Sequence, residues 1–207
     1  MAAVPATSVS AGEGAGPANP ARALLLLSAY GGLTAFVTSA MAVHLPALVA
    51  AAGATLAQAL LAGVLLGPAQ VAARLGEYVI AQRHSLHPLI TARVATALHP
   101  IACVVLGALS GVFGAYAAAG LCFAVLHGAG NGMISVAKGV LPLAIFGPAG
   151  YGSVTGKIAV AGRLTQAFAP LVFGVVLENG GAGWALGLSA ALGLASLLML
   201  AGLGRGR

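Results

Sequence analysis

Long stretches without a charged side chain limit what this sequence can fold into. No Asp, Glu, Lys or Arg occurs between Arg22 and Arg74, or between Arg93 and Lys138. Only 6% of all residues are charged, whereas a water-soluble domain carries about a quarter. Such a surface is suited to lipid rather than water. Because long apolar runs indicate spanning helices and not the short alternating strands of a barrel, we expect an all-α membrane protein.

The apolar stretches divide into six segments that are each long enough to cross a bilayer. The expected transmembrane helices are 23–49, 56–80, 91–109, 115–145, 152–177 and 184–203. They form a predicted six-helix transmembrane domain over residues 22–204. The Ala-, Pro-, Gly- and Ser-rich residues 1–21 predict a disordered lead-in, and residues 205–207 a basic cytoplasmic tail.

The basic residues alternate between connections, which predicts how the segments are oriented. Arg74, Arg83 and Arg93 surround the second connection, and Lys138 and Lys157 flank the fourth, whereas the first, third and fifth contain no Lys or Arg. The positive-inside rule then places both termini in the cytoplasm of a multi-pass protein of the cytoplasmic (cell) membrane. Because the positive charge is scattered rather than clustered, we do not expect nucleic acid as a partner.

Polar side chains inside apolar segments are costly in a bilayer and mark candidate functional residues. In the fourth segment, steps of four, four and three place a polar stripe on one helix face. The stripe consists of His127, Asn131, Ser135 and Lys138. It lines a water-filled path or, alternatively, makes hydrogen bonds between helices.

Arg163 lies well inside the fifth segment, and Gln166 shares its side of the helix. An ion pair is one explanation for Arg163, but outside the lead-in only Glu77 and Glu178 are acidic, and both lie at segment ends. We therefore expect Arg163 to face a cavity or an anionic or polar group of a solute.

Other intramembrane polar residues are weaker candidates. Thr34 and Thr38 lie one turn apart in the first segment, where they also suit helix packing, and Gln70 is a lone amide in the second. His44 and His99 are single histidines for which we expect a packing role. Glycines four residues apart predict close helix contacts. These pairs are Gly63 and Gly67, Gly107 and Gly111, Gly128 and Gly132, Gly152 and Gly156, and Gly183 and Gly187.

No enzyme signature stands out in the sequence. The segment "GYGSVTGKI" lacks the first Gly and the final Ser or Thr of a phosphate-binding loop. Cys103 and Cys122 both fall in apolar segments and have no metal-binding spacing. We expect no catalytic residues, no metal and no cofactor.

The pattern as a whole resembles the carboxy-terminal half of a major facilitator superfamily transporter. The resemblance covers roughly residues 22–204 and rests on the six-segment pattern, the basic second connection and stretches such as "LLGPAQVAARLGE" and "GYGSVTGKIAVAGRLTQAFAPLVFGVVLENGG". It implies two inverted three-helix repeats, about 22–109 and 115–204. It also implies a gating motif on the cytoplasmic side of the membrane. Arg74, Glu77 and Arg83 carry charges of the kinds found in that motif, and Lys138 lies on the same side of the membrane.

The same resemblance implies that particular residues line a substrate cavity. These are Thr34, Thr38, Gln70, His127, Asn131 and Arg163, with Gln166 as a weaker candidate. Because the family normally has twelve helices, one half implies a truncated sequence, a split transporter with a separate six-helix partner, or a homodimer.

The function expected on these grounds is secondary transport of a small polar or anionic solute, or of a drug-like compound, by alternating access. The alternative is a non-transporting membrane subunit or a truncated, degenerate transporter fragment. The expected partners are the lipid bilayer, the small-molecule solute and a possible second half.

Overall fold

Five α-helices account for nearly all of the residues that the computed structural model describes, which are 16–84 and 87–204. The helices are α1 Pro20–Ala51, α2 Leu56–Arg83, α3 Pro88–Gly111, α4 Tyr116–Phe146 and α5 Tyr151–Leu203. All five are long and apolar enough to cross a membrane. Residues 1–15 of the expected lead-in and the expected basic tail lie outside the described residues, whereas residues 20 and 21 already belong to α1.

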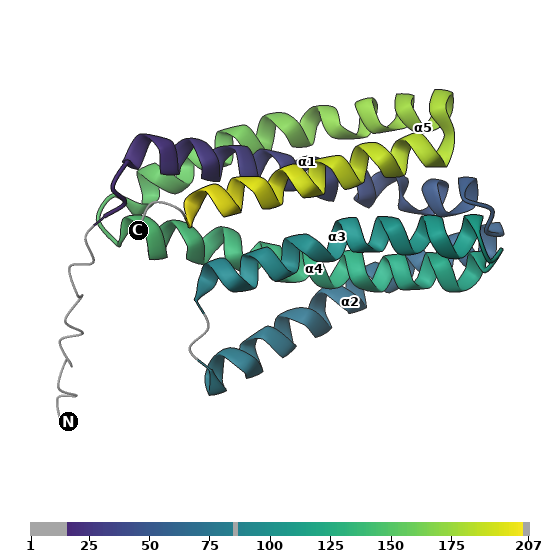
Figure 1. Cartoon of the computed structure of the whole chain (residues 1–207), viewed down its shortest axis with the longest axis horizontal. Helices are drawn as coiled ribbons and strands as arrows, with labels where there is room; N and C mark the ends of the chain where they lie inside the picture. Colours follow the sequence, from purple (N-terminus) through teal and green to yellow (C-terminus); the bar gives the residue numbers. More distant parts are fainter. Residues whose placement is uncertain (1–15, 85–86, 205–207) are drawn as a thin grey trace, which may run out of the picture.

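The expectation of six helices is wrong. The expectation of two three-helix repeats that form one half of a transporter bundle is therefore wrong as well. The segments expected at 152–177 and 184–203 form the single 53-residue α5. Its helical conformation is interrupted only at Gly181, which has φ 74° and ψ −176°. The ribbon of α5 turns back near this point (Figure 1), so we call residues 151–180 its outgoing limb and residues 182–203 its return limb.

Local sequence signals explain where several helices begin. The Asn19 side chain accepts a hydrogen bond from the Arg22 backbone N–H at the start of α1. Thr55 and Gln58 form a reciprocal capping box at the start of α2. Short connections with left-handed glycines at Gly114 and Gly147 then join antiparallel neighbours. As a result, the first and last described residues lie at the same end of the bundle (Figure 1).

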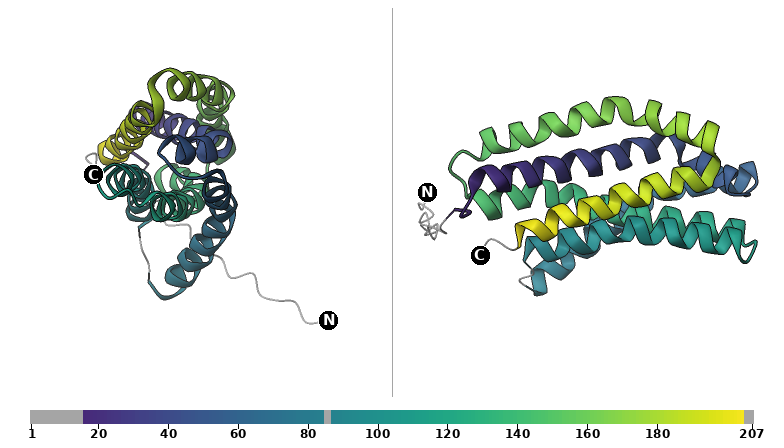
Figure 2. Two further views of the ribbon diagram at one scale, coloured as in Figure 1. Left: turned by 90° about the vertical axis from the view of Figure 1, so that its right-hand side faces the viewer. Right: turned by 45° about the horizontal axis from the view of Figure 1, so that its top comes forward.

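The helices pack as two groups. α1 packs mainly along α5, while α2 and α3 both pack on α4. The groups meet where α3 lies against α5, and α4 makes few contacts with α1 or α5. In the end-on view of Figure 2, α2 lies at the edge of the bundle. Only Ala59 and Ala62 of α2 are buried, so most of its apolar side chains face outward, where lipid would cover them.

Glycines on α4 allow the second group to pack closely. A Cβ atom on Gly128 would lie 2.9 Å from the Leu66 carbonyl oxygen of α2, and one on Gly130 would lie 2.6 Å from the Ala95 carbonyl oxygen of α3. Gly132 lies in close contact with the Gln70 backbone. The predicted close contact at Gly128 and Gly132 is therefore confirmed. The other four predicted glycine pairs do not form such close helix contacts. A Cβ atom on any of their glycines would meet open space, with the exception of Gly63.

Backbone hydrogen bonds lost at proline are replaced within the first group. Pro170 in the outgoing limb has no N–H to donate to the Gln166 carbonyl four residues earlier. The Ser39 hydroxyl of α1 donates to that carbonyl instead, at 3.0 Å. One turn further, His44 Nε2–H donates to the Pro170 carbonyl at 2.9 Å. These bonds tie α1 to the outgoing limb of α5.

Candidate functional site

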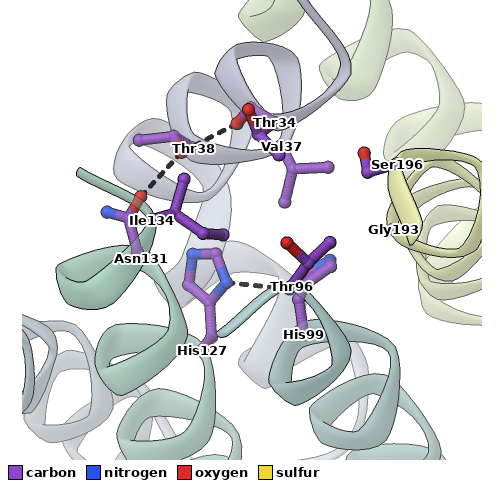
Figure 3. Close-up of a pocket in the computed structure, with 10 residues that line it drawn as sticks. All are labelled: Thr34, Val37, Thr38, Thr96, His99, His127, Asn131, Ile134, Gly193 and Ser196. Carbon is purple, nitrogen blue, oxygen red and sulfur yellow. Dashed lines mark hydrogen bonds between the residues drawn. The ribbon is translucent and has the colours of Figure 1, made fainter. Parts of the chain in front are cut away.

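Most of the buried polar side chains of the bundle gather where the two helix groups meet. We call this region the seam. Its residues are Thr34 and Thr38 of α1, Thr96 and His99 of α3, His127 and Asn131 of α4, and Ser189 and Ser196 of α5. Figure 3 shows the α1 side chains facing those of α4, with α3 and the return limb of α5 beside them. Polar groups from four helices therefore converge in an otherwise apolar bundle.

A small cavity of about 20 Å³ lies within the seam and is called the inner cavity here. It is lined by Thr34, Val37, Thr38, Thr96, His99, His127, Asn131, Ile134, Gly193 and Ser196. This volume is enough for about one water molecule. No charged side chain lines the inner cavity, and it is too small to be an open channel.

Two histidines form the centre of the seam. His99 Nδ1 and His127 Nδ1 lie 2.8 Å apart, and His99 Nε2 lies 2.6 Å from the Ser189 hydroxyl oxygen. Both rings are buried, with exposed fractions of 4% and 3%. Phe123 packs against both rings, and Cys103 Sγ lies 3.6 Å from His99 Nε2. His127 Nε2 is buried and has no hydrogen-bond partner.

A second polar contact crosses the seam between α1 and α4. The Thr38 hydroxyl lies 2.8 Å from both Asn131 Oδ1 and the Thr34 carbonyl oxygen, and its single hydrogen is donated to one of them at a time. The Thr34 hydroxyl bonds only within its own helix, to the Tyr30 and Gly31 carbonyls at 2.8 and 3.2 Å. Because α1 and α4 make few other contacts, the bond between Thr38 and Asn131 is a main polar link between these two helices.

A larger open cavity of about 440 Å³, called the basic cavity here, lies between α1, α4 and α5. Its polar lining residues are Lys138, Tyr151, Thr155, Arg163 and Gln166. No acidic residue is among the residues that line it. Tyr151 donates a hydrogen bond of 2.9 Å to the Gly139 carbonyl, which ties the start of α5 to α4. The arrangement offers two cationic groups to an anion.

The basic cavity lies next to the inner cavity along two helices. On α1, Thr34 lines the inner cavity and its neighbour Ala35 lines the basic cavity. On α4, Asn131 lines the inner cavity and Lys138, about two turns further on, lines the basic cavity. The polar stripe predicted on α4 therefore runs from one cavity to the other.

A third hollow, an apolar groove of about 480 Å³, lies between α2, α3 and α4. Arg74 and Glu77 line it together with apolar side chains such as Tyr78 and Val94. Arg74 Nε donates to the Gly132 carbonyl of α4 at 3.3 Å, whereas Glu77 Oε2 has no hydrogen-bond partner. These two predicted gating residues lie on the far side of α4 from the seam.

The structure separates the predicted site residues into three sets. Four of the predicted cavity residues line the inner cavity, and Arg163, Gln166 and Lys138 line the basic cavity. Gln70 lines neither, because its backbone packs against Gly132. Arg83 is exposed at the end of α2 and lines none of the three hollows. The roles of all these residues in binding or gating stay predictions.

The sequence reasoning missed several residues of the seam. His99 was assigned to packing, yet it contacts both His127 and Ser189. Thr96, His99 and Cys103 recur at steps of three and four in α3, a signal that places them on one helix face. Ser189 and Ser196 recur at a step of seven in α5, which also keeps one face.

Among residues 16–84 and 87–204, no group of three or more His, Cys, Asp or Glu is placed to hold a metal ion. Cys103 and Cys122 are both free thiols. No protein-family model matches the sequence, and no curated protein matches it. The function is therefore inferred from the geometry of the site itself.

Proposed function

We propose that the protein is a secondary membrane transporter that moves a small anionic solute through the seam between its two helix groups. The basic cavity is the observation that carries this proposal. It is open, has room for a small organic or inorganic anion, and is lined by Lys138 and Arg163 with no acid beside them. Cations within a membrane-spanning segment typically mark the path of a substrate or an ion.

The depth of the two cations supports a binding site rather than a surface patch. Lys138 lies eight positions before the end of α4 at Phe146, which is about 12 Å along the helix. Arg163 lies twelve positions after the start of α5 at Tyr151, about 18 Å along that limb. At this depth a side chain benefits from water or an anionic partner, which the cavity provides.

The arrangement of the helices supports alternating access. Both cavities lie where α1 and α5 face the other group, so each is bounded by helices of both groups. A change in the packing between the groups would alter both cavities while leaving each group intact.

The basic residues support a proposed orientation in the cytoplasmic membrane. The described chain begins and finishes at the same end of the bundle (Figure 1). Four basic residues lie near the helix termini at this end: Arg22, Arg83, Arg93 and Lys157. The positive-inside rule assigns this end to the cytoplasm. The basic cavity is then nearer to the cytoplasm than to the outer face.

Transport by the purified chain in proteoliposomes tests the proposal. We expect uptake of at least one of a set of small anions, such as inorganic phosphate and short mono- and dicarboxylates, above that of protein-free liposomes. Arg163→Gln and Lys138→Gln each remove a cationic contact worth about 1.5–3 kcal/mol, so each should lower this uptake about tenfold or more. The matched control is Lys157→Gln, because Lys157 is exposed on α5 and does not line the basic cavity.

Two results would contradict the proposal. Uptake of every anion at the level of protein-free liposomes would favour the alternative of a non-transporting membrane subunit. Uptake that Arg163→Gln and Lys138→Gln affect no more than Lys157→Gln would show that the basic cavity does not bind the solute.

A further inference from the structure

The contact between His99 and His127 has a consequence for protons that follows from its geometry. The two Nδ1 atoms are 2.8 Å apart, so one of them carries a hydrogen and the other accepts with its lone pair. In one neutral arrangement His99 donates, and its Nε2 then accepts from the Ser189 hydroxyl. In the other His127 donates, and His99 Nε2–H donates to the Ser189 oxygen, which is 2.6 Å away.

The second arrangement leaves a free lone pair on His127 Nε2. This atom is buried and has no hydrogen-bond partner among the residues that the structure describes. His127 lines the inner cavity, which has room for about one water molecule. Figure 3 shows the histidine among the polar side chains around this space. A proton delivered by such a water would meet a basic nitrogen whose lone pair is not already occupied by a donor.

The pair has a defined capacity of one added proton. After His127 Nε2 takes up a proton, the hydrogen between the two Nδ1 atoms can lie on either ring, and Ser189 still accepts from His99 Nε2–H. A second added proton would place hydrogens on both Nδ1 atoms and break the contact between them. The rings therefore hold one added proton as a unit, and neither ring acts alone.

The surroundings contain no fixed charge that would supply or neutralise this proton. From α1, the Tyr30 hydroxyl lies 3.5 Å from Thr96 Oγ1, and Thr96 lines the inner cavity. α3 contributes the thiol of Cys103, and α5 contributes only the hydroxyls of Ser189 and Ser196. On α4 the neighbours Phe123 and Asn131 do not titrate. No residue of α2 lines the inner cavity.

We propose that His99 and His127 form a binding site for a single proton, which enters at His127 Nε2 and is shared across the contact between the two Nδ1 atoms. Because a bare charge in an apolar bundle is costly, the protonated pair favours an arrangement in which the inner cavity takes up more water. The Ser189 contact, which crosses between the two helix groups, is kept in the protonated pair, so protonation acts on the seam through the hydration of the inner cavity. This site is distinct from the basic cavity and requires no solute.

Nuclear magnetic resonance of the full-length protein in lipid bilayers, with ¹⁵N-labelled histidine, tests the proposal without any solute. The wild type should show a ¹⁵N–¹⁵N coupling between the two Nδ1 atoms. On acidification from about pH 8 to about pH 4, both rings should shift at one common midpoint. The His84→Gln variant is the matched control, because His84 is exposed just after α2 and lies outside the seam. It should leave this transition unchanged.

Variants separate a shared site from two independent rings. In His127→Gln the entry nitrogen is absent, so the transition of His99 should be lost. In His99→Gln the transition of His127 should move or disappear. The proposal is overturned if the wild-type rings shift at different midpoints, if neither shifts over this range, or if His99 titrates unchanged in His127→Gln. The wild-type measurement decides the matter even if a variant fails to fold.

Because the measurement contains no solute, its outcome is independent of the transport assay. A common transition without anion uptake would keep the proton site and remove the proposed function. Anion uptake without a common transition would keep the proposed function and remove the proton site.

Discussion

A close contact between α3 and α4 makes a sharp stability prediction at Gly130. A Cβ atom added there would lie 2.6 Å from the Ala95 carbonyl oxygen and 3.2 Å from Leu98 Cβ, both on α3. Ordinary contacts between such atoms are about 3.5 Å or longer. In Gly130→Ala, α3 and α4 would therefore have to separate locally by up to about 1 Å.

The size of the effect follows from this separation. A gap of about 0.5–1 Å removes roughly a quarter to a half of the dispersion energy of each contact that opens. Overpacking of this kind typically costs about 1–3 kcal/mol. The same substitution favours the helix itself by up to about 1 kcal/mol, because alanine has a higher helix propensity than glycine. We expect the clash to dominate, since the contacted oxygen belongs to the backbone and cannot rotate away.

Unfolding by sodium dodecyl sulfate from mild detergent micelles, followed by circular dichroism, measures the difference. Gly139→Ala is the matched control on the same helix, because a Cβ there meets nothing within 4 Å. Gly130→Ala should lower the free energy of unfolding by about 1–2 kcal/mol, which is the overpacking cost less the gain in helix propensity, and Gly139→Ala should leave it unchanged or raise it by up to about 1 kcal/mol. Equal stability of the two variants would refute the inference that α3 and α4 are held at glycine contact.

Three further predictions concern the turn and the seam. Gly181→Ala should lower stability by about 1–3 kcal/mol in the same assay, because the backbone at Gly181 occupies a region open almost only to glycine; Gly183→Ala, at a helical position with open space, should not. In a double-mutant cycle, Thr38→Val and Asn131→Leu should couple by about 0.6 kcal/mol, typical of hydrogen bonds in membrane proteins; strict additivity would contradict the bond. Arg93→Gln should speed amide exchange in the last turn of α5, because Arg93 Nη2 donates to a carbonyl there at 3.0 Å; unchanged exchange would show that this bond does not hold the helix end.

The positions of the first four helices could be predicted because lipid imposes a simple length and polarity rule. The expected second segment, 56–80, begins where the capping box starts α2, and the expected fourth segment, 115–145, nearly coincides with α4. The error came at "ENGGAG", which has the composition of a loop. One residue at positive φ was enough to reverse the chain there, so helical structure continues on both sides of Gly181.

The candidate site was predictable only in part, because spacing within one helix shows a shared face but not its partner. The stripe on α4 was recognised, yet the partner of His127 comes from α3 and the partner of His99 comes from α5. Similarly, Lys138 and Arg163 are 25 positions apart in the sequence and share a cavity only because α4 and the outgoing limb of α5 run antiparallel on two sides of it. Contacts between helices depend on rotation about each helix axis, which a single sequence does not specify.

The distribution of bonds in the bundle indicates where it opens most easily. Within the groups, glycines bring backbones into contact at Gly128 and Gly130, and separating them would remove dispersion contacts along whole helices. Across the seam, by contrast, the polar links are single hydrogen bonds such as those from Thr38 to Asn131 and between His99 and Ser189. Each such bond in a membrane is worth about 0.6 kcal/mol on average. Breaking a few of them costs no more than the few kcal/mol that separate alternative conformations of one protein. Opening at the seam would also separate apolar contacts that cross it, such as that between Gly120 of α4 and Val49 of α1, and it would hydrate both the basic cavity and the histidine pair.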